Sequence, residues 1–130
     1  MIIFVDNNKV SNFFNSNLIQ EANFEHKTIC FEETKEALNY LTPLQAVTTA
    51  PIYVFIKMDM PGLNAWEFIE KCQTLAGNKE YLRIVLMLKQ ELDVEEEIKV
   101  NDYDHVTTVL SYELDAEFIS TLLLEPTASM

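Results

Sequence analysis

The chain has 130 residues, and 48% of them are apolar, which suits a single globular domain with a core of its own. Its 21 acidic and 9 basic residues give a formal net charge of −12. This charge argues against binding to nucleic acid and to anionic membranes, because both require a basic surface. The composition therefore favours a protein or a cation as the partner.

The sequence shows neither a membrane span nor a secretion signal. Arg83 interrupts the apolar run "YLRIVLML" before it reaches the length of a membrane span. The start, "MIIFVDNN", lacks the basic region that is typical of a signal peptide. We therefore expect a cytoplasmic protein.

The common catalytic and metal-binding motifs are missing. Cys30 and Cys72 form no CxxC pair, and His26 and His105 are isolated from each other and from the cysteines, so no metal-ligand spacing is present. The patterns GxxxxGK[ST], GxGxxG and GxSxG are also absent. We expect both cysteines to be packed or half-buried thiols.

Five short apolar runs have the length and composition of β-strands. The third, "IYVFI" at 52–56, is apolar throughout, as is expected of a strand that is buried on both faces of a parallel sheet. The fifth carries two threonines, which favours an edge position. The predicted strands cover residues 1–5, 26–31, 52–56, 83–88 and 105–110.

A segment with helical periodicity or a helix-start signal follows each predicted strand. The first helix has apolar residues at helical spacing, which predicts a buried stripe of Val10, Phe13, Phe14 and Leu18. The third has Asn64 at its start as a capping residue. The predicted helices cover about 8–22, 32–41, 64–75, a short segment that begins near Asp93, and 115–125.

The alternation of strands and helices predicts an α/β fold. Helices between parallel strands form right-handed crossovers and cover both faces of the sheet. We therefore expect one doubly wound domain at residues 1–125, built on a five-stranded parallel sheet. Residues 126–130 are expected to form a frayed tail.

Polar side chains follow four of the five predicted strands. Because the carboxyl ends of parallel strands meet at one edge of the sheet, these residues predict a polar site there. Solvated loops at the rim of the sheet are the alternative interpretation. The candidate residues are Asp6, Asn7, Lys57, Asp59, Lys89, Ser111 and Tyr112.

Four segments together resemble a response-regulator receiver domain of two-component signalling: "IIFVDNN", "YVFIKMDMPGLNAWEF", "IVLMLKQELD" and "VLSYEL". They occur in the family's order and span nearly the whole chain. The resemblance implies a flavodoxin-like fold and transfer of a phosphoryl group from a histidine kinase to an aspartate that ends the third strand. It also implies Mg²⁺ held by two acids after the first strand, a Thr or Ser after the fourth, and a Lys-Pro after the fifth.

The chemical positions of that family carry other residues here. Lys57 stands at the acceptor position, and Asn7 replaces the second acid beside Asp6. Lys89 stands at the Thr/Ser position, and Tyr112-Glu113 replaces Lys-Pro. The resemblance therefore implies a degenerate receiver, often called a pseudo-receiver.

The chemistry of lysine agrees with this interpretation. A carboxylate can form an acyl phosphate, whereas an ammonium is neither a nucleophile nor a ligand for Mg²⁺. We expect Lys57 to occupy the metal's place and to pair with Asp6 and Asp59, with weak or absent Mg²⁺ binding and no other cofactor.

Three hypotheses follow. The first, which we favour, is a non-enzymatic interaction module that is not phosphorylated and binds a histidine kinase or another signalling protein through its fourth helix, fifth strand and fifth helix. The second is an active receiver with Asp59 as a displaced acceptor. The third is an enzyme in which Lys57 or Lys89 acts as a base or a Schiff-base nucleophile.

Overall fold

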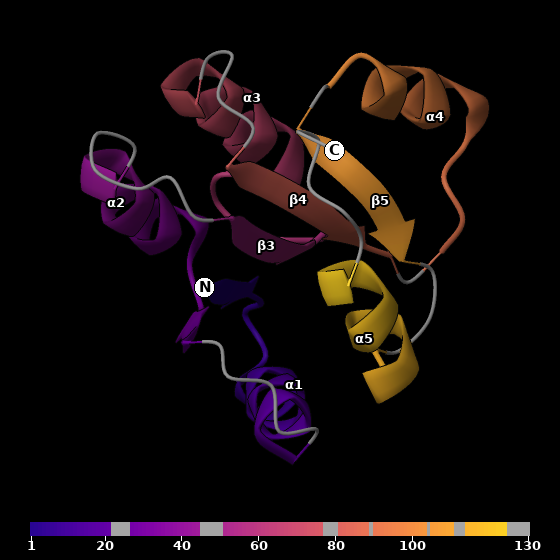
Figure 1. The fold of residues 1–130 in the computed structure, drawn as a ribbon. Helices are drawn as coiled ribbons and strands as arrows, with labels where there is room; N and C mark the ends of the chain where they lie inside the picture. Colours follow the sequence, from indigo (N-terminus) through magenta and orange to yellow (C-terminus); the bar gives the residue numbers. More distant parts are fainter. Residues whose placement is uncertain are drawn as a thin grey trace.

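A parallel β-sheet forms the centre of the molecule (Figure 1). The computed structural model describes residues 1–21, 27–44, 51–76, 81–88, 90–103, 105–110 and 114–124. Within them the sheet has five strands in the order β2-β1-β3-β4-β5, and every neighbouring pair is parallel. The strands are β1 (Ile2–Val5), β2 (Thr28–Phe31), β3 (Ile52–Lys57), β4 (Leu82–Met87) and β5 (Val106–Leu110).

Helices cover both faces of this sheet, which confirms the predicted doubly wound α/β fold. Figure 1 shows α1 and α5 on one face and α2 and α3 on the other. β5 lies at one edge, as its threonines predict. The helices are α1 (Lys9–Glu21), α2 (Thr34–Leu44), α3 (Ala65–Ala76), α4 (Val94–Asn101) and α5 (Ala116–Leu124).

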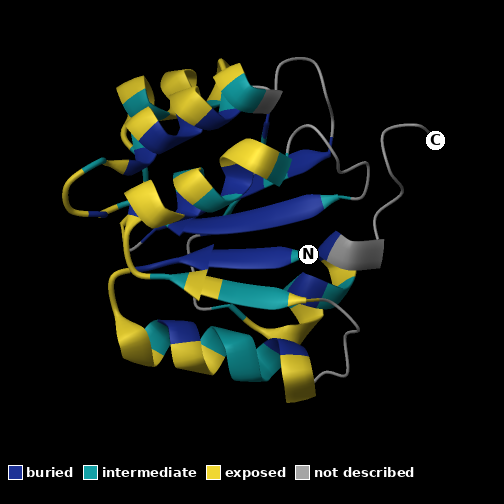
Figure 2. Cartoon of the chain, turned by 90° about the vertical axis from the view of Figure 1, so that its left-hand side faces the viewer, coloured by how far each residue is buried: buried dark blue, intermediate teal, exposed yellow. Residues whose placement is uncertain are grey.

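β3 lies in the middle of the sheet and is buried on both faces (Figure 2). Successive side chains of a strand point to opposite faces, so β3 contributes to two separate cores. Val54 and Ile56 belong to the core under α2 and α3. Tyr53 and Phe55 belong to the core under α1 and α5, where the Phe55 ring lies 5.0 Å from that of Phe4.

Side-chain oxygens cap the first turns of α1, α3, α4 and α5. At α4 the Asp93 carboxylate accepts a hydrogen bond from the Glu96 backbone N–H at 2.8 Å, and Glu96 accepts one from the Asp93 N–H at 3.1 Å. This reciprocal pair is a capping box. At α3 the Asn64 side chain accepts from the Glu67 N–H at 3.0 Å, which confirms Asn64 as a capping residue.

The buried face of α1 differs from the sequence prediction. The helix is present, but Val10, Phe13 and Phe14 are exposed, and its buried residues are Asn12 and Ile19. Ile19 belongs to the core under α1 and α5, and Leu18 packs against that core. On the same side of the helix, the Asn12 side chain donates a hydrogen bond of 2.8 Å to the backbone carbonyl of Asp6.

The end of α2 was also predicted wrongly. The helix continues beyond residue 41 to Leu44 and includes Pro43. A proline in the last turn removes a single backbone hydrogen bond, and Leu44 packs against the core under α2 and α3. The predicted tail, residues 126–130, lies outside the described residues.

The two cysteines have different environments. Cys72 is buried in the core, and burial raises the pKa of its thiol to about 12. Cys30 lies at the surface, but its thiol is half-buried: the Sγ donates to the Asn12 backbone carbonyl at 3.7 Å, and desolvation raises the pKa of the thiol. In the described part of the chain, no helix is both long and apolar enough to cross a bilayer.

Burial of β3 leads to a stability prediction. Phe55→Ala should lower the free energy of unfolding by about 3–5 kcal/mol, because it removes a fully buried ring and leaves a cavity. The matched control is Phe13→Ala, which removes an exposed ring and should change stability by less than about 0.5 kcal/mol. Urea denaturation measures both values, and equal losses would contradict the assignment of Phe13 to the surface.

Candidate functional site

The site lies where β1 and β3 end at the carboxyl edge of the sheet. The two strands are neighbours, and Val5 pairs with Ile56 in their register. The next residues along each strand, Asp6 and Lys57, therefore leave the sheet side by side. Parallel pairing alone brings an acid and a base together from positions 51 residues apart in the sequence.

The ammonium group of Lys57 contacts both polar residues that follow β1. Its Nζ donates a hydrogen bond to Asn7 Oδ1 at 3.0 Å and lies 3.9 Å from Asp6 Oδ1. The side chains of Lys57 and Asp6 are 16% and 8% exposed, respectively. The ion pair is thus largely shielded from water, which strengthens the attraction but also adds a desolvation cost.

The loop after β1 is fixed by further hydrogen bonds. Asp6 Oδ1 accepts from the Asn8 N–H at 2.9 Å, and Asn8 Oδ1 accepts from the N–H groups of Val10 and Ser11 at 2.9 and 3.2 Å. Asn12 holds the Asp6 carbonyl, while its own Oδ1 is buried without a partner among the described residues. Sequence reasoning did not single out Asn8, although an Asn between a strand and a helix is a helix-cap signal.

Asp59 lies apart from this arrangement. It is exposed in the turn that follows β3, and among the described residues it forms no ion pair with Lys57. The expected pairing of Lys57 with Asp59 is therefore absent. Asp59 instead lines a small pocket on the α4 side together with Glu91 and Glu96.

The remaining candidates, Lys89, Ser111 and Tyr112, lie outside the described residues, and so does Glu113. Of the predicted site, the structure therefore brings together Asp6, Asn7 and Lys57, and it places Asp59 on the neighbouring turn.

The contacts of Lys57 involve the oxygens that a divalent cation would use. The oxygens of Asp6 and Asn7 are the ligands that a hard cation would need, and Lys57 already contacts both. A fixed ammonium also repels a cation at this distance. Across the described ranges, no group of three or more His, Cys, Asp or Glu side chains could hold a metal ion.

The contact between Lys57 and Asn7 can be measured by a double-mutant cycle. Lys57→Met and Asn7→Ala should show a coupling free energy of about 1 kcal/mol, because each substitution removes the same charge-assisted hydrogen bond. A control cycle combines Asn7→Ala with Lys71→Met, an exposed lysine on α3, and should show none. Urea denaturation supplies the values, and equal coupling in both cycles would contradict the contact.

The backbone closely matches solved receiver structures, whereas the sequence matches them weakly. A response regulator receiver protein from Dyadobacter fermentans has a TM-score of 0.79 at 18% identity, over 94% of this chain and 93% of that one. A two-component response regulator from Cytophaga hutchinsonii has a TM-score of 0.78 at 24% identity, over 94% and 92%.

The receiver domain of the histidine kinase CKI1 from Arabidopsis thaliana, solved with Mg²⁺ and BeF₃⁻, has a TM-score of 0.68 at 17% identity, over 95% and 85%. No protein-family model matches the chain, and no curated protein matches its sequence. At these identities the likeness establishes the fold. The chain has the fold of response-regulator receiver domains, which confirms the fold that the sequence resemblance implies.

Proposed function

We propose that this protein is a receiver-like module of two-component signalling that acts by binding another protein and is not phosphorylated. One observation carries the proposal: Lys57 ends β3 and directs its ammonium at the oxygens of Asp6 and Asn7. The receiver fold supports the signalling class. A histidine kinase or another signalling protein is the proposed partner, and the cytoplasm is the proposed location.

The chemistry of phosphoryl transfer supports the loss of phosphorylation. An acceptor must supply a nucleophilic oxygen, and a divalent cation must offset the charge that develops on the phosphoryl group. Lys57 supplies no oxygen, and its ammonium occupies the oxygens that would hold the cation. The CKI1 receiver domain was solved with Mg²⁺ and BeF₃⁻; here the contacts of Lys57 with Asp6 and Asn7 support the proposal that such binding is lost.

The alternatives have less support. Asp59 has an oxygen nucleophile, but it lies on an exposed turn beside Glu91 and Glu96 rather than beside Asp6. Lys57 as an enzymatic nucleophile is disfavoured because both of its contacts are acceptor oxygens that bind an ammonium. The proposed module is therefore not an enzyme.

The first test is incubation with acetyl phosphate and Mg²⁺, followed by intact mass spectrometry. We expect no phosphoryl adduct on the wild-type protein, because no described carboxylate lies at the acceptor position. Asp59→Asn is the matched variant and should behave identically. A hydroxylamine-sensitive adduct that appears on the wild-type protein and disappears in Asp59→Asn would overturn the proposal and favour the displaced acceptor.

Restoring the acceptor alone should not restore the chemistry. Lys57→Asp should remain poorly phosphorylated, because Asn7 supplies no charge for the cation and Lys89 and Tyr112 replace the groups that the family uses. The double variant Lys57→Asp with Asn7→Asp should bind Mg²⁺ at least about tenfold more tightly than the single variant, a difference of about 1.4 kcal/mol. Isothermal titration with Mg²⁺ measures the affinities, and robust Mg²⁺-dependent labelling of the single variant would contradict this expectation.

A further inference from the structure

Helix α1 presents three large apolar side chains to solvent. Val10, Phe13 and Phe14 are 62%, 64% and 67% exposed, and the two rings lie edge to face with their centroids 6.4 Å apart. Ile19 of the same helix is fully buried, so α1 has one apolar side toward the sheet and a second toward solvent. Neighbouring exposed rings of this kind are typical of a protein-binding surface.

A pocket of about 520 Å³ lies beside these rings, between α1, the end of β4 and the start of α5, on the face that α1 and α5 cover (Figure 1). A volume of this size is large enough for a phenylalanine side chain. Phe14 lines the pocket, whereas Phe13 stands outside it. One surface therefore carries both a projecting ring and a hollow that can receive such a ring. The apolar lining consists of Val10, Phe14, Leu18, Met87 and Leu114.

The α1 surface carries little charge, although the whole chain has a net charge of −12. The helix contains one base, at its first residue, and one acid, at its last. Two acids near the pocket already have partners: Asp6 pairs with Lys57, and the Asp115 carboxylate caps the first turn of α5. At physiological ionic strength, charges farther away than about 8 Å are largely screened. A second copy of this chain can therefore approach α1 with little like-charge repulsion.

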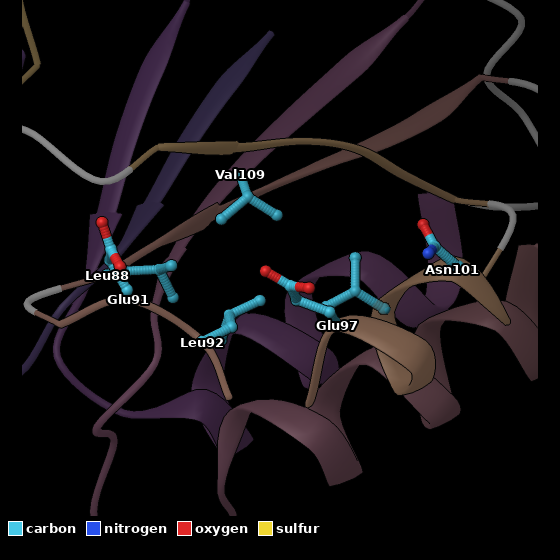
Figure 3. A pocket seen from close by; sticks show the side chains of 7 residues that line it. Leu88, Glu91, Leu92, Glu97, Asn101 and Val109 are labelled. Atoms are coloured by element: carbon cyan, nitrogen blue, oxygen red, sulfur yellow. The ribbon is translucent and has the colours of Figure 1, made fainter. Parts of the chain in front are cut away.

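Helix α4 also exposes apolar side chains, but acids surround them. Val94 and Ile98 are 71% and 59% exposed, and the first turn of this helix carries three glutamates. Figure 3 shows Glu97 of α4 together with Glu91 at the pocket beside the helix. Two copies that met at α4 would bring these acids together, and like charges facing each other oppose association. Of the two exposed apolar helix surfaces, α1 is therefore the one that suits a second copy.

We infer that two copies of this chain form a dimer through α1. A two-fold axis beside α1 relates the copies, so that Phe13 of each copy enters the pocket of the other and packs against Phe14 and Leu18. An interface of this type is self-complementary and closes at two copies. A helix of 13 residues with one pocket offers less area than the roughly 800 Å² per partner of a standard interface. We therefore expect a Kd of about 10–100 µM.

Sedimentation equilibrium of the full chain, from about 5 µM to about 1 mM, measures the association. We expect monomers and dimers without larger species. Because salt screens the repulsion between two acidic copies, the Kd should fall or stay constant as NaCl rises from about 0.05 to about 0.5 M. Amide chemical shifts of the ¹⁵N-labelled protein should change with concentration in α1 and at Leu114, and stay constant in α4.

Matched variants separate α1 from the other exposed apolar side chains. The double variant Phe13→Ala with Phe14→Ala should raise the Kd at least about tenfold, because aromatic side chains at the centre of an interface contribute much of its affinity. Both rings are exposed and alanine favours helix, so this variant should fold normally. The control, Val94→Ala with Ile98→Ala on α4, should leave the Kd within about twofold. The amide spectrum of each variant verifies that it is folded.

A protein that stays monomeric at about 1 mM would overturn the inference and leave the α1 surface to a partner of another kind. Species larger than dimers, a Kd that rises with salt, equal losses in both double variants, or shifts confined to α4 would also overturn it. The acetyl phosphate experiment tests the proposed function separately, because the dimer requires neither the presence nor the absence of a phosphoryl group.

Discussion

Burial of β3 on both faces is the constraint on which the other features depend. A strand of consecutive apolar residues requires a helical layer on each side, and the two cores that result are built on alternate residues of β3. Its position between β1 and β4 also fixes its last residue at the middle of the sheet edge. Lys57 is that residue, so its side chain emerges from the core directly beside the loop that follows β1.

Lys57 matters more for the charge that it places at the end of β3 than for its contribution to the stability of the fold. A shielded ion pair gains attraction and loses hydration in similar amounts, so its contacts need not contribute much net stability. Under the proposed function, their effect is to place a positive charge where a divalent cation would otherwise be attracted. Asp59 lies on the turn that follows β3, where it lines a small pocket together with Glu91 and Glu96. The carboxyl edge therefore has an ion pair at its centre and acidic side chains beside it.

The parts of the structure that follow from hydrophobic periodicity could be predicted from the sequence. The strands are mostly apolar and the helices between them have capping residues, so the element order and the parallel sheet could be inferred. The orientation of α1 could not, since the apolar pattern does not distinguish the exposed face of Phe13 and Phe14 from the face on which Ile19 is buried and Asn12 donates to the Asp6 carbonyl. The proximity of Asp6 and Lys57 follows from parallel pairing, whereas the separation of Asp59 depends on the direction of a turn.

The ammonium of Lys57 has a consequence for what would set the strength and the duration of a signal from this protein. An acyl phosphate is a reversible covalent modification, and its rate of hydrolysis sets how long an ordinary receiver stays phosphorylated. The lysine at the end of β3 has no oxygen that could form an acyl phosphate. Under the proposed function, the strength of the signal is set by how many copies of the protein are present, and its duration by how long each copy survives.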